Sequence, residues 1–317
     1  MILDGPHAAP RLEGVAAHAR VMDRLAAQVR TLSRFFPPGG RVAYLDLPLH
    51  GNVGDLLIYL GTERFLAEQR QRVVLRTTCA ASPARIARRI GTGDLICLHG
   101  GGNFGDLYPA HQEFRRAVVE RFPDNRIVVM PQTVHFGDGS LWHLLEPFRR
   151  HRRLTVCVRD RASARALAEA GIEDVVLVPD MAHLLWQDRP AGGGGGPLYL
   201  LRRDQEAPAG VGPQTAAPAF DWGDLIHPAE RRCFHLLQIA ARRHLPVAPL
   251  WQPLAARLAR RAERLLARHD HVVTDRLHGV ILSALLSRRV TALDNSYGKV
   301  SAYVDLWLAR SPLIARG

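Results

Sequence analysis

Apolar residues recur along this chain with two different spacings. From residue 11 to 36 they return every three or four positions, as at Leu12, Val15, Ala19 and Met22, and arginines take other positions. This spacing predicts a helix with one apolar face. From residue 41 onward, short runs that are apolar throughout alternate with segments of helical spacing. The pattern therefore predicts a leading helix followed by alternating strands and helices.

The alternation predicts the fold class. The apolar runs are residues 42–47, 73–77, 94–99, 126–131, 154–158 and 175–179. Strands without polar alternation are buried on both faces, which is typical of a parallel sheet covered by helices on each side. Pro83 after Ser82 favours a helix start, and Gly171 favours a helix end. We therefore expect an α/β fold with a doubly wound, Rossmann-like domain.

A second series of elements follows a glycine run at 192–196, which is typical of a linker. Its segments are 198–204, 229–244, 253–268, 272–275, 277–286 and 290–295, and a final helix. With 317 residues the chain is long enough for two domains. We expect Rossmann-like domains at 1–190 and 197–317 that face a cleft in a GT-B-like arrangement. The last helix is expected to pack back on the N-terminal domain.

The charge balance points to anionic partners. The chain has 42 Lys and Arg against 30 Asp and Glu, a formal charge of +12. Such a surface suits nucleic acid, an anionic membrane face or small anionic substrates. The basic residues are scattered among helices, aromatics make up 7%, and no nucleic-acid motif occurs, so we expect no nucleic-acid partner. The leading basic helix either packs on a domain or docks at an anionic inner-membrane face.

Cysteines and the N-terminus bear on location. The four cysteines, at 79, 97, 157 and 233, show no CxxC pairing, which favours a reducing cytoplasm and argues against a zinc site. The first ten residues hold no apolar signal core, and no apolar stretch of 18 residues follows. The expectation is a cytoplasmic protein, with peripheral contact to the inner face of the inner membrane.

Two glycine-bearing loops follow strands in the first half. LHGNVGDLLI places Gly51 and Gly54 around Asn52, so that backbone amides and a helix N-terminus face one spot. Asp55 either caps that helix or serves a site. The second loop, HGGGNFGD, has the polar side chains Asn103 and Asp106, and its glycines Gly101 and Gly102 allow a ligand close to the backbone.

The second loop also invites three interpretations that the rest of the chain does not support. GGGNFG formally matches GxGxxG, but the next strand, RIVVMPQ, ends without the acidic residue that binds an adenosine ribose. HGGG is similar to the oxyanion loop of lipases, yet the chain has no GxSxG sequence. A Walker lysine motif is missing too.

Further polar residues end the strands that follow. MPQTVHFG brings Gln132, Thr133 and His135 to one strand end, where His135 suits either a structural role or a site. Arg159 and Asp160 hold the corresponding place in CVRDRAS, and this pair also suits the simple role of fixing the loop.

The second half has two strand ends that carry arginine. YLLRRDQE contains Arg202 and Arg203, and TDRLHG contains Arg276 and His278. Arginines at two neighbouring strand ends form a cradle for a small dianion, because guanidinium groups make two-pronged contacts to phosphate and carboxylate. The alternative for Arg276 is a simple ion pair with Asp275 or Asp294.

These loops together resemble the polysaccharide pyruvyl transferase family. The matching stretches, in order, are GNVGDLLI, LHGGGNFGD, PQTVHF, RDxxS at 159–163, LLRRDQE, TDRLHG and LDNSYGK. The resemblance implies a GT-B-like fold, phosphoenolpyruvate as the donor and a lipid-linked sugar of an exopolysaccharide repeat unit as the acceptor. The family's donor-binding Arg-Leu-His falls on Arg276, Leu277 and His278, and an upstream family arginine falls on Arg202 or Arg203.

The implied reaction joins pyruvate to a sugar as a ketal and releases phosphate, with no cofactor and no metal. His278 is expected to be the acid, with Asp55 and His135 as alternatives for the base. Substrate contacts are expected from Arg276, Leu277, Arg202, Arg203, Asn52, Gly101, Gly102, Asn103, Asp106, Gln132 and Lys299. Two rival functions remain, a GT-B glycosyltransferase that uses a nucleotide sugar and a non-catalytic protein that binds glycans or anions.

Overall fold

The computed structural model describes residues 8–137, 142–188, 194–204, 219–294 and 298–317, with side chains from residue 13. The strands are β1 Arg41–Leu45, β2 Arg72–Arg76, β3 Leu95–Leu98, β4 Gly101–Gly105, β5 Ile127–His135, β6 Leu154–Val158, β7 Val175–Leu177, β8 Leu198–Leu200, β9 His271–Thr274, β10 Arg289–Ala292 and β11 Ile314–Arg316. The α-helices are α1 Ala8–Arg30, α2 Val53–Glu68, α3 Pro83–Ile86, α4 Pro109–Arg121, α5 Glu146–Arg150, α6 Arg161–Glu169, α7 Pro228–Arg242, α8 Ala248–Leu266, α9 Leu277–Leu285 and α10 Lys299–Tyr303. Residues 192 and 193 of the predicted linker lie outside the described residues.

The N-terminal half is built on a parallel sheet, as the uniformly apolar strands predicted. Its strand order is β2-β1-β3-β5-β6-β7, and β4 pairs with β5. The strand that follows β1 in the chain, β2, lies on one side of β1, whereas β3 lies on the other side. Loops that follow β1 and β3 therefore diverge and open a crevice, the usual ligand site in such sheets. The α/β class and the Rossmann-like sheet are confirmed.

Alternate residues of each strand pack against different helices. In β1, Val42 and Tyr44 belong to the hydrophobic cluster on the face covered by α1 and α2, whereas Ala43 and Leu45 belong to the cluster on the other face. Phe114 of α4 and Leu167 of α6 pack into that second cluster. Both faces are thus buried, which is why these strands carry no polar alternation.

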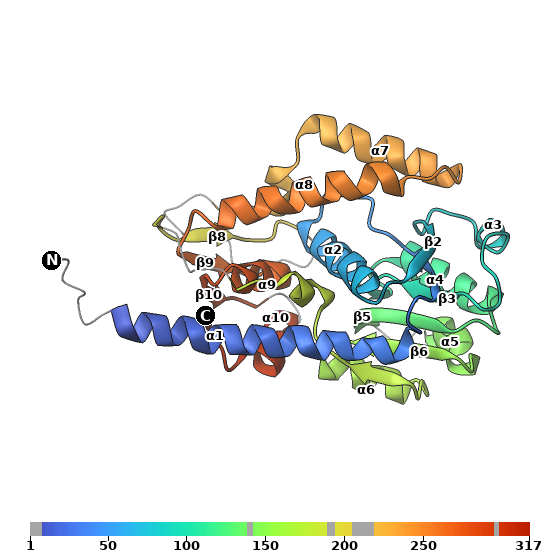
Figure 1. Ribbon diagram of the computed structural model, residues 1–317, viewed down its shortest axis with the longest axis horizontal. Coiled ribbons are helices and arrows are strands. Elements are labelled where there is room, and N and C mark those ends of the chain that lie inside the picture. The colour runs from blue at the N-terminus through green and yellow to red at the C-terminus, as the bar shows by residue number, and fades with distance from the viewer. Residues whose placement is uncertain (1–7, 138–141, 189–193, 205–218, 295–297) are drawn as a thin grey trace.

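A second parallel sheet, with the order β11-β10-β9-β8, forms the C-terminal half (Figure 1). Its core is continuous with that of the first sheet. The cluster that contains Val42 and Tyr44 also contains Leu200 of β8, Trp251 of α8 and Val272 of β9. Helix α8 lies along α2 and connects the two halves (Figure 1).

Helix α1 runs beside both halves (Figure 1). Met22, Leu25 and Val29 on its apolar face are buried, and the buried His18 ring contacts Ser311 Oγ at 2.7 Å and the Ala284 carbonyl at 2.8 Å. Of the two interpretations of this helix, packing on the protein accounts for the apolar side chains from Met22 to Val29. Its exposed side keeps basic residues such as Arg20.

The last helical segment reaches the N-terminal half. The Tyr303 hydroxyl accepts a hydrogen bond from the Asp180 amide at 2.9 Å, and the Trp307 indole donates to the Arg159 carbonyl at 2.8 Å. These contacts lie where the final helix was expected to pack. The division of the chain into two domains stays a prediction, since the hydrophobic core extends across the expected boundary.

The glycine-rich loop differs from its expected form. Gly101–Gly105 forms strand β4, paired with the end of β5. Gly101 and Gly105 have φ of 127° and 123°, and a Cβ atom at Gly105 would lie 1.7 Å from the His135 carbonyl oxygen. Only glycine fits that position, so the run that looks like a ligand loop is also required for strand pairing.

Candidate active site

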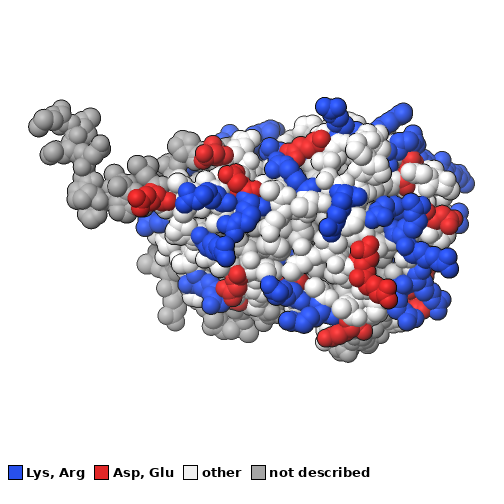
Figure 2. Space-filling view, turned by 60° about the horizontal axis from the view of Figure 1, so that its bottom comes forward, with Lys and Arg blue, Asp and Glu red and all other residues white. Residues whose placement is uncertain are grey.

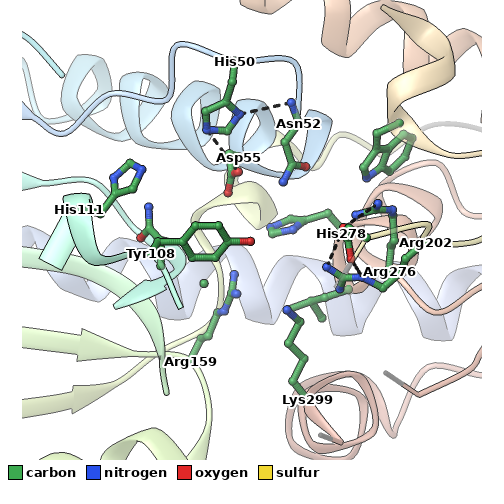
Figure 3. Close-up of a pocket in the computed structure, with 15 residues that line it drawn as sticks. His50, Asn52, Asp55, Tyr108, His111, Arg159, Arg202, Arg276, His278 and Lys299 are labelled. Carbon is green, nitrogen blue, oxygen red and sulfur yellow. Dashed lines mark hydrogen bonds and ion pairs between the residues drawn. The ribbon is translucent and has the colours of Figure 1, made fainter. Parts of the chain in front are cut away.

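A pocket of about 320 Å³ lies where the crevice of the first sheet meets the strand ends of the second. It is bounded by loops that follow β1, β3, β6, β8, β9 and β10. The lining residues are His50, Asn52, Asp55, Gly102, Asn103, Tyr108, His111, Arg159, Arg202, Asp204, Trp222, Arg276, Leu277, His278 and Lys299 (Figure 3). The pocket thus collects side chains from both halves of the chain.

Arg276 forms a two-pronged ion pair at the C-terminal side of the pocket. Its Nε and Nη2 donate to the Asp221 carboxylate at 2.5 and 2.7 Å, and Nη2 also lies 3.0 Å from Asp204 Oδ2. Neither Asp275 nor Asp294, the partners considered from sequence, makes this contact with the guanidinium. Asp221 thus fixes the direction of the Arg276 side chain.

Asp204 bridges two arginines. Its carboxylate accepts from Arg202 Nε at 2.8 Å and from Arg202 Nη2 at 3.2 Å, besides its contact with Arg276. The Asp204 side chain is 43% exposed, whereas those of Arg202 and Arg276 are 6% and 10% exposed. An accessible carboxylate therefore occupies the contacts that a small anionic ligand would make with these two guanidinium groups.

Arg203 points elsewhere. It pairs with Asp224 at 3.0 Å and donates to the Ala219 carbonyl at 2.6 Å, and its side chain is 55% exposed. Of the two arginines left open by the sequence, Arg202 is the one that lines the pocket.

His278 lies at the centre of the pocket (Figure 3). Behind it lies the buried carboxylate of Asp180. His278 Nε2 is 3.3 Å from Asp180 Oδ2, and the same oxygen accepts from Arg159 Nη1 at 2.5 Å. Burial alone would raise the pKa of Asp180, but His278 and Arg159 outweigh burial and hold that pKa below its usual range. An ionised Asp180 therefore balances the charge of the buried Arg159 guanidinium and contacts the His278 ring at Nε2.

The first turn of α2 holds the His278 ring from the other side. A Cβ atom at Gly54 would lie 2.5 Å from His278 Nδ1, so a larger residue would push the ring away. The Asn52 side chain caps the helix by accepting from the Gly54 amide at 3.0 Å. Of the two roles left open for Asp55, capping is performed by Asn52, and Asp55 faces the pocket (Figure 3).

A second pair of cations lies across the pocket from Arg202. These cations are Arg159 and Lys299, which both lie close to Gly102. A Cβ atom added at Gly102 would lie 3.4 Å from Arg159 Nη2 and 4.0 Å from Lys299 Nζ. Arg159 is also tied to Thr133 Oγ1 through its Nε at 2.8 Å and is 2% exposed. The Gly102 position is thus approached by two positive groups, both of which line the pocket.

His111 belongs to a buried charge cluster at the pocket wall. Its Nδ1 lies 2.7 Å from Asp46 Oδ1, and Arg115 Nη2 lies 2.6 Å from Asp46 Oδ2. Burial lowers the pKa of His111, but the Asp46 carboxylate more than offsets this and raises the pKa to about 10. His111 is therefore a cation at neutral pH.

One group among the described residues has the composition of a metal site. Ligand atoms of Asp46, Cys79 and His111 lie within 4.8 Å of one another. Spacing along the chain does not reveal this group, because the fold assembles it from two distant loops and the start of helix α4. Arg115 already neutralises the Asp46 carboxylate, which disfavours a divalent cation there. The expectation that no metal is required stays a prediction.

Comparisons with known proteins decide the family. The sequence model of the family described as polysaccharide pyruvyl transferase matches residues 52–297. The chain belongs to this family. It is 36% identical over 300 residues to EpsO of Bacillus subtilis, which is named as a pyruvyl transferase, and the match covers 92% of each protein. It is also 29% identical to pyruvyl transferase 1 of Schizosaccharomyces pombe, over 84% of this chain and 70% of that protein.

The fold is similar to that of a solved structure. A Klebsiella pneumoniae protein described as uncharacterized matches 92% of this chain and 98% of its own, with a TM-score of 0.64 and 20% identity. This likeness shows the fold alone. The enzyme class comes from the family, and this chain is an enzyme of the polysaccharide pyruvyl transferase type.

The pocket of this pyruvyl transferase gathers many of the residues expected from sequence. Asn52, Asp55, Gly102, Asn103, Arg202, Arg276, Leu277, His278 and Lys299 line it. The expected residues that do not line it are Gly101, Asp106, Gln132, His135 and Arg203. Buried Gln132 donates to the His99 carbonyl at 2.6 Å, and Asp106 accepts from the Gly137 amide at 2.5 Å.

Several residues in the pocket lining or directly behind it carried no clear signal in the sequence. Asp180 follows a short strand in VPDMAH and looks like a helix cap, which it also is, since it accepts from the Ala182 amide at 2.9 Å. Arg159 was placed at a strand end where either a site or a loop-fixing role was open, and it was not among the expected substrate contacts. His50 and His111 are single histidines in loops or helix starts, where the sequence does not separate a structural role from a functional one.

Proposed function

We propose that this enzyme transfers the pyruvyl group of phosphoenolpyruvate to two hydroxyls of a lipid-linked exopolysaccharide sugar, forming a ketal and releasing phosphate. The observation that carries the proposal is one pocket that combines four arginine and lysine side chains with an imidazole held against a carboxylate. The cationic residues are Arg159, Arg202, Arg276 and Lys299. Phosphoenolpyruvate offers a phosphate and a carboxylate to match them.

The donor would bind by displacing Asp204. The contacts that this carboxylate makes with Arg202 and Arg276 suit either anionic group of phosphoenolpyruvate. Arg159 and Lys299, across the pocket, would hold the other group near the Gly102 backbone. The reacting double bond would then lie beside His278, which stands between the two cationic pairs (Figure 3).

The chemistry requires one acid and one base. His278 would protonate the methylene carbon, which leaves positive charge at the adjacent carbon, and a sugar hydroxyl would add there. Phosphate would then leave, and the second hydroxyl would close the ketal. Of the two protons released by the hydroxyls, one restores the proton that His278 gave to the methylene carbon, and the other leaves on the phosphate. Asp55 suits the base better than His135, since Asp55 lines the pocket and His135 does not.

The acceptor would reach the site through an adjoining groove of about 460 Å³. This groove shares His50, Asn52 and Trp222 with the donor pocket and continues along α7 past His235 and Gln238. Polar and aromatic side chains of this kind suit a saccharide that extends beyond the reacting sugar. The two halves would act as the two domains of a GT-B-like enzyme. The N-terminal half was expected to form the acceptor side, but most residues of this groove come from the C-terminal half, so the acceptor would contact both.

A cytoplasmic location with peripheral contact to the inner membrane belongs to the same proposal. No helix among the described residues is long and apolar enough to span a bilayer. A lipid-linked acceptor would then be met at the membrane surface, and the protein would need neither a cofactor nor nucleic acid.

Ligand-dependent melting and phosphate release would test the function. Phosphoenolpyruvate should raise the melting temperature, and nucleoside diphosphates should not. Phosphate should be released from phosphoenolpyruvate only when an acceptor glycan is present. Stabilisation by a nucleoside diphosphate would favour a glycosyltransferase, and ligand stabilisation without turnover on any acceptor would favour a binding protein.

A further inference from the structure

Exposed leucines gather at one end of the molecule. Of the four large hydrophobic side chains that are exposed among the described residues, three lie in the hairpin of α7 and α8. Leu245 and Leu250, at the turn of this hairpin, are 57% and 68% exposed. A single exposed leucine is ordinary, but two at one turn form an apolar patch that water does not favour.

The turn borders a groove of about 500 Å³. The opposite wall is formed by β2 and α3, which lie at the same end of the molecule as the turn (Figure 1). The apolar lining residues are Val73, Val74, Leu75, Ile86, Leu245, Pro246, Ala248 and Pro249. None of them lines the donor pocket, so the groove is a separate feature.

Arginines without acidic neighbours surround this groove. Arg85, Arg88 and Arg89 line it, are exposed, and have no carboxylate oxygen within 4.0 Å among the described residues. At this end, segment 69–93 contains 6 arginines and no Asp or Glu, and the hairpin turn at 242–250 adds Arg242 and Arg243, also without an acidic residue. Arg76, which lines the groove as well, is already paired with Glu63 at 2.8 Å. On the face shown in Figure 2, by contrast, acidic side chains lie among the basic ones.

We propose that Arg85, Arg88, Arg89, Leu245 and Leu250 form a docking surface for an anionic lipid bilayer, here called the tip surface. The arginines would contact lipid phosphates while the leucines enter the boundary between headgroups and acyl chains. A nucleic acid would satisfy the arginines but would leave the leucines in water. Among the described side chains of helix α1, Met22, Leu25 and Val29 of its apolar face are already buried, so they are not free for this purpose.

Vesicle flotation of the full chain tests the proposal. Phosphatidylcholine vesicles with and without one quarter phosphatidylglycerol would be compared at low and high salt. The charge variant is Arg85→Gln with Arg88→Gln and Arg89→Gln, and the apolar variant is Leu245→Ser with Leu250→Ser. A matched control, Arg20→Gln with Arg24→Gln and Arg34→Gln, removes the same charge from exposed positions of the N-terminal helical segment.

The parent should float with anionic vesicles and not with neutral ones, and less at high salt. Each arginine lost from the tip surface should weaken partitioning about fivefold, and loss of both leucines should weaken it at least tenfold. The matched control should stay within about threefold of the parent at 0.15 M salt, where charges away from the bilayer are screened.

Three results would overturn the proposal. These are failure of the parent to bind anionic vesicles, equal loss in the control and the charge variant, and full binding by the apolar variant. Tight binding of an oligonucleotide that survives the leucine changes would identify the surface as a nucleic-acid site. The tip surface lies outside the donor pocket, so phosphoenolpyruvate should stabilise all variants as much as the parent. If phosphoenolpyruvate does not stabilise the parent, that result counts against the proposed function and not against the tip surface.

Discussion

Arg276 and Asp221 make their ion pair across a sequence separation of 55 residues. The sequence marks Arg276 as a candidate because an arginine and a histidine interrupt the join between an apolar strand and an apolar helix. It does not mark Asp221, since one acidic residue in a polar segment has no special pattern. Local sequence therefore predicts which cation enters the site, and the fold decides which carboxylate orients it.

Arg276→Lys should disable the enzyme nearly as severely as Arg276→Ala. Lysine keeps the charge but cannot make a two-pronged contact with either Asp221 or a donor anion. We expect kcat/KM for phosphate release to fall by a factor of about 30 to 1,000, the equivalent of about 2–4 kcal/mol. Arg203→Lys, on an exposed side chain outside the pocket, is the matched control. Full turnover by Arg276→Lys would contradict a donor-binding role.

Asp180→Asn should lower kcat more than it raises KM for phosphoenolpyruvate. The amide keeps the shape of the side chain but loses the charge that faces His278 and Arg159. We expect kcat to fall at least tenfold, and we expect the loss in a double variant with His278→Gln to be far less than the product of the single losses. Asp106→Asn, outside the pocket, should retain activity. If the double variant instead loses kcat by the product of the two single losses, Asp180 and His278 act independently.

The His111–Asp46 pair should give the fold a pH-dependent contribution. Because the pKa of His111 is raised from 6.5 to about 10, this contribution is complete below about pH 6.5, declines as pH rises and is lost above about pH 10. His111→Gln should therefore be less stable than the parent by about 2 kcal/mol at pH 6, with a smaller difference at pH 10.5. Denaturant unfolding at both pH values measures this. A difference that grows with pH would be inconsistent with a protonated His111.

At the scale of elements, the sequence predicts the apolar strands well, but it does not predict the strands that lack an apolar run. Every predicted strand is present, since an apolar run of four to six residues flanked by helical spacing has few other structures open to it. Strand β4 was missed because Gly101–Gly105 lacks the apolar side chains that identify strands. Strand β11 is a three-residue edge strand, too short to give a pattern.

Gly54→Ala tests how closely helix α2 supports the site. Its Cβ would lie 2.5 Å from His278 Nδ1, so the ring must move, whereas the helical backbone at this position accepts alanine. We expect at least a thirtyfold loss of kcat, since small displacements of a catalytic group are costly, and a change in melting temperature of only a few degrees. Gly93→Ala, which meets nothing within 4 Å, is the control. Unchanged turnover in Gly54→Ala would show that His278 need not pack against α2.

At the scale of the whole molecule, periodicity predicts two series of elements but not how they join. Leu200, Trp251 and Val272 share one hydrophobic cluster with Val42 and Tyr44 of the first sheet. Such contacts depend on which helix face packs against which sheet. The sequence pattern shows that an apolar residue is buried, but it does not show against which element. The same limit applies to the site, whose lining comes from six separate loops.

This continuous core predicts that the enzyme unfolds as one unit. Helix α1, helix α8 and the Tyr303–Asp180 contact each connect the two halves, so neither half keeps its buried surface when the other unfolds. Scanning calorimetry should show a single transition in which the calorimetric and van't Hoff enthalpies agree. Phosphoenolpyruvate should move that transition upward as a whole, by an amount set by its concentration relative to Kd. Two separated transitions, with only the later one shifted by the donor, would instead describe halves that fold independently, and the donor would then be held by one half alone. A single shifted transition requires that the arginines of the C-terminal half and Arg159 of the N-terminal half be held in one cooperative structure, which is the arrangement that a two-sided anion pocket needs.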